Sequence, residues 1–132
     1  KMFGSIPIFG NSENKIDSKG RIFLPKFTDA EENDQLVIQK GNGNFYVIVN
    51  CSKVESEIKL LKKDSKEDKI ALLTSSIVAL VKVDKQRRIH FNPDEKFAID
   101  RKVFIHGNYD SVQIFSSEED YNEYITTLKK SR

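Results

Sequence analysis

Two aspartate–arginine pairs of equal spacing are the residues best suited to chemistry in this chain of 132 residues. Asp17 precedes Arg21 by four positions, and Asp84 precedes Arg88 by the same interval, 67 residues further along. Basic side chains surround both pairs: Lys15, Lys19 and Lys26 near the first, and Lys82, Lys85 and Arg87 near the second. Positive charge gathered around an arginine in this way is typical of a surface that binds phosphate groups.

A single Asp–Arg pair is more often a modest surface salt bridge than a binding site. Its recurrence among basic neighbours favours a binding surface. Each aspartate is better suited to forming a turn than to contacting an anion, because its carboxylate accepts backbone N–H groups and repels negative charge. We therefore expect Asp17 and Asp84 to shape the tips of two β-hairpins. Gly20 would supply a positive φ if the first turn needs one, whereas Arg87 at the matching position requires a different turn or a strained one.

Strand alternation predicts the direction of the side chains that follow each turn. Successive residues of a strand face opposite sides, so Ile22 and Leu24 are expected to lie inside. Arg21 and Phe23 then face solvent. In the second motif the same phase gives these sets: Ile89 and Phe91 inside, Arg88 and His90 outside.

The segments beyond the motifs also recur in kind. Each motif is followed by two apolar, β-branched or aromatic runs joined by a turn rich in Gly, Asn or Asp, which is the pattern of a β-hairpin. These runs cover residues 35–39 and 45–49 in the first half, and 102–106 and 112–115 in the second. The apolar lead-in to the second motif, residues 77–83, is expected to be a strand.

Helix signals follow both predicted hairpins. Residues 52–55 and 116–119 have the Ser-x-x-Glu pattern of a capping box, in which the serine accepts a helix N–H and the glutamate reaches back. Apolar residues then recur at helical spacing: Val54, Ile58 and Leu61, and later Tyr121, Ile125 and Leu128. A further short helix is expected after a start signal at residues 65–68.

This recurring order predicts an α+β fold of two pseudo-repeats, each a small β-barrel-like unit with a C-terminal helix. We assign residues 1–65 to the first repeat and 66–132 to the second. The lysine-rich segment 62–66 is too short to separate two independent domains. We therefore expect the repeats to pack together as one compact domain.

Composition limits the class of protein. Hydrophobic residues make up 38% and charged residues 32%, which fits a soluble fold, and no apolar run approaches the roughly 20 residues of a membrane helix. The N-terminus lacks the pattern of a signal peptide. The single cysteine, Cys51, cannot form an internal disulfide, which favours a reducing compartment. We expect a cytoplasmic protein without membrane contact.

No grouping of residues indicates catalysis. His90 and His106 lack metal-ligand spacing, and Cys51 is better explained as a structural thiol. Serine, histidine and aspartate occur without the spacing of a triad. The glycine-rich segment 41–44 joins two strands instead of opening a helix, so it does not match a phosphate-binding loop. We expect no enzyme activity, metal or cofactor.

The motif residues 17–25 and 84–89 closely resemble the paired DxxxR motifs of the MraZ family, bacterial transcriptional regulators in the wider AbrB/SpoVT swapped-hairpin group. The resemblance covers essentially the whole chain, from Met2 and Phe3 to the closing helix. It implies an AbrB/MraZ-like double-ψ β unit in each half, a ring-shaped homo-oligomer, and association with the nucleoid. It also implies binding of double-stranded DNA, with target repeats near the promoter of the division and cell-wall gene cluster.

Motif position and charge together give the expected DNA-binding residues: Lys15, Lys19, Arg21, Lys82, Lys85, Arg87 and Arg88. In the family the second motif usually has glycine before its arginine, where this chain has Arg87. An alternative class is a protein-interaction module, like an antitoxin of the same swapped-hairpin group. Such antitoxins typically carry a disordered tail, whereas the last helix here is expected to run almost to residue 129.

Overall fold

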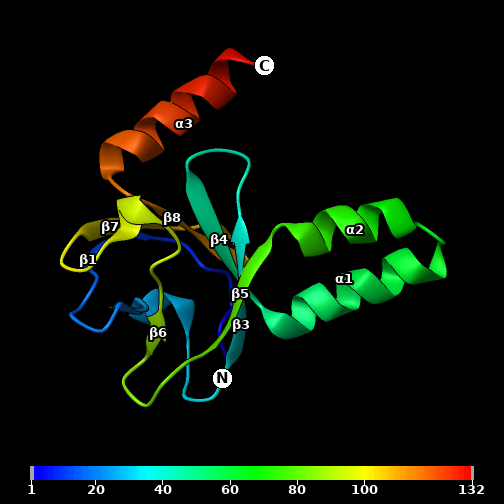
Figure 1. Cartoon of the computed structure of the whole chain (residues 1–132), viewed down its shortest axis with the longest axis horizontal. Helices are drawn as coiled ribbons and strands as arrows, with labels where there is room; N and C mark the ends of the chain where they lie inside the picture. Colours follow the sequence, from blue (N-terminus) through cyan, green and yellow to red (C-terminus); the bar gives the residue numbers. More distant parts are fainter. Residues whose placement is uncertain (1, 132) are drawn as a thin grey trace.

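The computed structural model describes residues 2–131 and confirms an α+β fold with three α-helices (Figure 1). Its strands are β1 (Asn11–Lys15), β2 (Arg21–Phe23), β3 (Gln35–Lys40), β4 (Phe45–Asn50), β5 (Ile77–Lys82), β6 (Arg88–His90), β7 (Lys102–Gly107) and β8 (Ser111–Phe115). The helices are α1 (Cys51–Lys63), α2 (Glu67–Ser75) and α3 (Glu118–Lys130). Short 3-10 turns follow the motif strands at Lys26–Thr28 and Glu95–Phe97.

Six strands form one antiparallel sheet in the order β1-β7-β8-β4-β3-β5, and β2 pairs with β6 outside it. Strands from both halves of the chain are mixed within this sheet, because β1 pairs with β7, β4 with β8 and β3 with β5. Strands β1 and β5 are its two open edges. The sheet is therefore not closed into a barrel, and the expectation of a barrel-like unit within each half was wrong.

The motif strands also pair differently from expectation. β1 and β2 flank the first motif turn, yet β1 bonds to β7 and β2 bonds to β6, so this turn is not the tip of a hairpin. The second turn likewise joins β5, which bonds to β3, to β6. In the β2–β6 pair, Arg21 lies opposite His90, Ile22 opposite Ile89, and Phe23 opposite Arg88. This exchange lets both motif strands cover the same core with their apolar faces.

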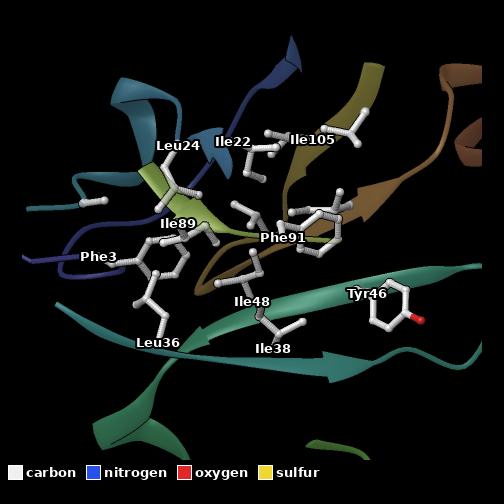
Figure 2. Close-up of a cluster of buried hydrophobic side chains, with 14 of the residues drawn as sticks. Phe3, Ile22, Leu24, Leu36, Ile38, Tyr46, Ile48, Ile89, Phe91 and Ile105 are labelled. Atoms are coloured by element: carbon white, nitrogen blue, oxygen red, sulfur yellow. The ribbon is translucent and has the colours of Figure 1, made fainter. Parts of the chain in front are cut away.

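The main core lies between the β2–β6 pair and the large sheet (Figure 2). Ile22, Leu24, Ile89 and Phe91 are each at most 2% exposed, as strand alternation predicted. They pack with side chains of the sheet and of the lead-in segment: Phe3, Leu36, Ile38, Ile48 and Ile105. Phe23, on the opposite face of β2, is 51% exposed. Burial of the inward residues therefore fixes which side chains of the motif strands face out.

The helices lie outside this core. α1 and α2 form a helical hairpin beside β3, β4 and β5, with Val54 buried and Ile58 packed against the same cluster (Figure 1). α3 packs on β7 and β8 through Tyr121, whose ring lies 5.1 Å from that of Phe104. The predicted short middle helix and the strand after it are confirmed as α2 and β5.

Both predicted capping boxes begin at the wrong residue. The N-cap of α1 is Asn50, whose side-chain oxygen accepts from the Ser52 N–H at 2.9 Å. The N-cap of α3 is Ser117, which accepts from the N–H of Asp120 at 3.1 Å. Asparagine caps a helix at least as well as serine, so the helix starts directly from the last residue of β4. The Ser116–Ser117 pair offered two equivalent starts, and the second is used.

Candidate nucleic-acid interface

The first motif turn is closed by its aspartate. One carboxylate oxygen of Asp17 accepts from the backbone N–H groups of Lys19 and Arg21, each at 2.9 Å. The other accepts from Nε of Arg21 at 3.0 Å. The Gly20 N–H donates to the Asp17 carbonyl at 3.0 Å. A single carboxylate therefore fixes both the backbone of the turn and the guanidinium that follows it.

The second turn repeats this arrangement. Asp84 Oδ1 accepts from the N–H groups of Gln86 and Arg88, each at 2.8 Å, and Oδ2 accepts from Nε of Arg88 at 2.8 Å. The Arg87 N–H donates to the Asp84 carbonyl at 3.1 Å. The two turns thus share the same hydrogen bonds despite their different sequences.

The two turns also share a left-handed residue. Gly20 has a φ of +76°, and Arg87 at the matching position has a φ of +60°. Glycine adopts this conformation freely, whereas the Cβ of any L-residue is crowded there. Of the two possibilities left open for the second turn, the structure shows the strained one.

The hydrogen bonds hold both aspartates in the charged form. The backbone N–H of Arg21 lowers the pKa of Asp17, and the N–H of Lys19 and the Arg21 guanidinium add to it against the opposing effect of burial. For Asp84 burial is the largest single influence and raises the pKa, but the combined bonds from Arg88 and Gln86 outweigh it and leave the pKa lowered. Both carboxylates are therefore ionised at neutral pH and accept charged hydrogen bonds from the arginine Nε atoms.

The register of the β2–β6 pair collects the outward side chains into one patch, which we call the ribbon face: Arg21, Phe23, Arg88 and His90. The side chains of Arg21 and Arg88 are 22% and 20% exposed. Their Nε atoms are occupied by the aspartates, and no acceptor among residues 2–131 bonds their terminal nitrogens. Each arginine thus presents free N–H donors in a fixed orientation, which suits bidentate binding of phosphate or a base edge.

The remaining predicted basic residues flank the ribbon face instead of lying on it. Because β2 and β6 are antiparallel, the two turns stand at opposite ends of the pair. The lysines are all exposed: Lys19 and Lys85 in the turns, and Lys15 and Lys82 at the ends of β1 and β5. Arg87 is half-buried. The structure therefore brings Arg21 and Arg88 together and spreads the other five predicted residues to either side.

Two residues of this surface were absent from the predicted set. His90 stands directly opposite Arg21, and strand phase had already placed it outside, so the signal for it was present. Asn14 lies on β1, and its side-chain amide donates to the backbone carbonyl of Phe23, tying the sheet edge to β2. Nothing in the sequence indicates this bond, because it depends on the unexpected strand pairing.

Other kinds of site find no support in the described part of the chain. Residues 2–131 contain no group of three or more His, Cys, Asp or Glu side chains placed to hold a metal ion. None of the helices described is both long and apolar enough to cross a membrane. Cys51 is half-buried, and burial, with the nearby Glu55 carboxylate, raises the pKa of its thiol.

Comparison with known proteins identifies relatives along nearly the whole chain, although no family model matches it. Transcriptional regulator MraZ of Thermoanaerobacter pseudethanolicus is 30% identical over 125 residues, which cover 87% of this chain and 86% of the relative. MraZ of Caldanaerobacter subterraneus subsp. tengcongensis is 30% identical over 128 residues, covering 88% and 87%. MraZ of Caldicellulosiruptor bescii is 31% identical over 115 residues, covering 83% and 80%.

The fold and the site define an α+β protein in which two strands that each follow an Asp–Arg turn pair with each other and present their arginines on one face. All the relatives found carry the name of a transcriptional regulator. The chain belongs to the MraZ family, which confirms the resemblance drawn from its two motifs.

Proposed function

We propose that this protein is a sequence-specific transcriptional regulator that binds double-stranded DNA against its ribbon face. The observation that carries the proposal is the matched pair of arginines: Arg21 and Arg88 share one face, with Nε fixed by aspartate and the terminal nitrogens free. A two-stranded antiparallel ribbon fits the major groove of B-DNA. The names of the relatives support regulation as the purpose of that binding.

The basic residues divide into two roles under this proposal. Arg21 and Arg88 contact guanine edges or phosphates, since arginine pairs bidentately with either. The flanking cations contact phosphates, setting affinity and salt dependence without reading sequence: Lys15, Lys19, Lys82, Lys85 and Arg87. Asp17 and Asp84 shape the turns and orient the arginines, and they do not contact DNA.

We also propose that residues 1–65 and 66–132 are two copies of one ancestral unit. Two strand pairings support this, because a shift of 67 residues relates them: Glu13 lies opposite Phe104, and Val37 lies opposite Leu80. The matching hydrogen bonds of the two turns support it further. The duplicated unit then exchanges its strands between copies instead of folding by itself.

Several subunits would join into a ring-shaped homo-oligomer. β5 is an open edge, and its outward Val78 and Leu80 are 50% and 65% exposed, which is apolar surface suited to contact another subunit. A ring places several ribbon faces on adjacent DNA repeats, so individually weak contacts combine into tight binding. We propose promoter repeats of the division and cell-wall gene cluster as the target, and the nucleoid as the location. Light scattering tests the assembly: Leu80→Glu should lower the molar mass of the particle.

DNA binding is tested by fluorescence anisotropy with a labelled duplex from upstream of the protein's own gene. Arg21→Ala and Arg88→Ala should each weaken binding by about tenfold or more, the loss of one charged hydrogen-bonding group. Lys129→Ala, on α3, removes the same charge from an exposed position and should change affinity less than about twofold, as expected of a rim charge. A scrambled duplex tests sequence preference. Unchanged binding by both arginine variants, with fold and mass intact, contradicts the proposal.

A further inference from the structure

Arg87 occupies a position whose backbone conformation suits glycine. Its φ of +60° lies in the left-handed region, where arginine is crowded by its own Cβ. The equivalent turn in the first motif is closed by the same hydrogen bonds with Gly20 at φ +76°. Turn geometry therefore does not require an arginine, and the arginine makes the folded state less favourable.

The Arg87 side chain has no ion pair with the described residues, and its buried Nε has no hydrogen-bond partner. The Nε atom is almost fully enclosed by protein atoms. Among residues 2–131 no carboxylate forms an ion pair with its guanidinium, and its terminal nitrogens are not among the buried unpartnered atoms. The free protein thus holds a half-buried cation with open donors at the end of the β2–β6 pair.

This side chain also makes the two turns unequal in charge. Residues 17–21 contain Lys19 and Arg21 against one aspartate. Residues 84–88 contain three cations against one aspartate: Lys85, Arg87 and Arg88. The second turn therefore carries one more positive charge than the first, from the residue that strains its backbone.

We propose that Arg87 makes the second turn the stronger of the two phosphate-binding turns, so that each subunit grips DNA asymmetrically. This inference rests on the proposed DNA binding. A phosphate oxygen can accept from the terminal nitrogens of Arg87, which have no acceptor within the described residues, while the buried Nε stays out of reach. The cost of the left-handed arginine is then offset in the complex, and the second turn holds its DNA strand more firmly than the first.

The test compares two asparagine variants that each remove one positive charge from a turn. Asparagine tolerates the left-handed conformation, so Arg87→Asn keeps the second turn, and Lys19→Asn is the matched change in the first. Measured on the same duplex over a range of salt, Arg87→Asn should weaken binding about tenfold and lower the salt slope by about one. Lys19→Asn should weaken binding about threefold or less, as a solvated lysine in the weaker turn.

Thermal unfolding supplies an independent readout. Arg87→Asn should unfold at the same temperature as wild type or higher, because it relieves strain, while Lys19→Asn should leave the temperature unchanged. A second pair of variants moves the charge between the turns. Arg87→Gly alone should bind DNA about tenfold more weakly than wild type, and the exchange variant Gly20→Arg/Arg87→Gly should recover nearly all of that loss, since the dominant turn has moved.

Two results overturn the inference while the proposed function stands: equal DNA binding by Arg87→Asn and Lys19→Asn, or a clear fall in unfolding temperature for Arg87→Asn. The first shows equivalent turns, and the second shows that Arg87 has a structural role. Failure of the proposed function gives a different result, in which wild-type protein of native mass does not bind the duplex and Arg21→Ala changes nothing.

Discussion

Arg88 lies across the β2–β6 pair from Phe23, with its guanidinium carbon 5.8 Å from the centre of the aromatic ring. Asp84 holds Nε of the same arginine at 2.8 Å. The ring and the carboxylate together restrict the planar guanidinium, and an aromatic face attracts a cation in this geometry. Phe23 is half-exposed, so it belongs to the ribbon face and supports an arginine without contributing to the core.

Phe23→Ala should weaken DNA binding by about two- to fivefold, because the arginine loses an attraction worth about 0.5–1 kcal/mol at an exposed site. Its unfolding temperature should change little. Phe9→Ala is the control, since Phe9 is 67% exposed and lies outside the ribbon face. Anisotropy titrations of both variants check this, and equal affinities for the two would show that Phe23 does not help to position Arg88.

Asp84→Asn should destabilise the protein at pH 7 by about 1 kcal/mol, a fall of roughly 3–5 °C in unfolding temperature, because the amide cannot accept from Arg88 Nε with its nitrogen. The folded-state pKa of Asp84 is lowered from 3.8. Its contribution to stability is therefore complete above that value and is lost as the pH falls through the lower folded pKa.

The difference in unfolding temperature between wild type and Asp84→Asn should accordingly shrink as the pH falls below 3.8, which thermal melts in a buffer series can measure. Glu119→Gln, an exposed change on α3, controls for general effects of charge. A gap that stays constant from pH 7 to pH 3 would contradict the assigned role of the carboxylate.

Ile89→Ala should cost about 3 kcal/mol of unfolding free energy, the usual range for a large-to-small change in a core being about 2–5 kcal/mol. Ile89 is 1% exposed and faces Ile22 at the centre of the β2–β6 pair. Ile89→Val should cost only about 1 kcal/mol. Urea unfolding measures both, and a loss below about 1 kcal/mol for the alanine variant would mean that this pair packs loosely.

Tyr46→Phe should remove about 1 kcal/mol of stability near pH 8, because the phenol donates to Asp94 Oδ2 at 2.7 Å. Burial, and then the hydrogen bond and charge of Asp94, raise the pKa of Tyr46 to about 12. The contribution is present below the ordinary value of 10 and is lost as the pH rises toward 12. Ultraviolet titration of wild type should show a late-ionising phenol that is lost in the variant.

Local features of this fold were predictable from the sequence. Alternation along β2 and β6 placed Ile22 and Ile89 inside and Arg21 and Arg88 outside, because one strand face must bury its apolar side chains whatever its partner is. The apolar, β-branched run after α2 likewise identified β5.

Pairing between distant strands was not predictable. Periodicity shows which face of a strand is buried but does not show which strand lies beside it. We therefore expected β2 and β6 each to pair with the strand before its own turn, whereas they pair with each other. The ribbon face depends on that pairing, and so does the position of His90 opposite Arg21. The sequence likewise did not decide the backbone conformation of Arg87. The hydrogen bonds that both turns share select the left-handed conformation, and the sequence alone does not indicate those bonds.

The exchange of strands between halves also has a consequence for how the protein is made. β1 pairs with β7, β2 with β6 and β4 with β8. In each pair the second strand is synthesised more than 60 residues after the first. Contacts this distant in sequence close slowly and late. We expect a nascent chain that ends before residue 88 to lack both the arginine pair and the complete six-stranded sheet, although β3, β4 and β5 can already pair. The proposed DNA-binding surface would therefore form only once most of the chain has been made.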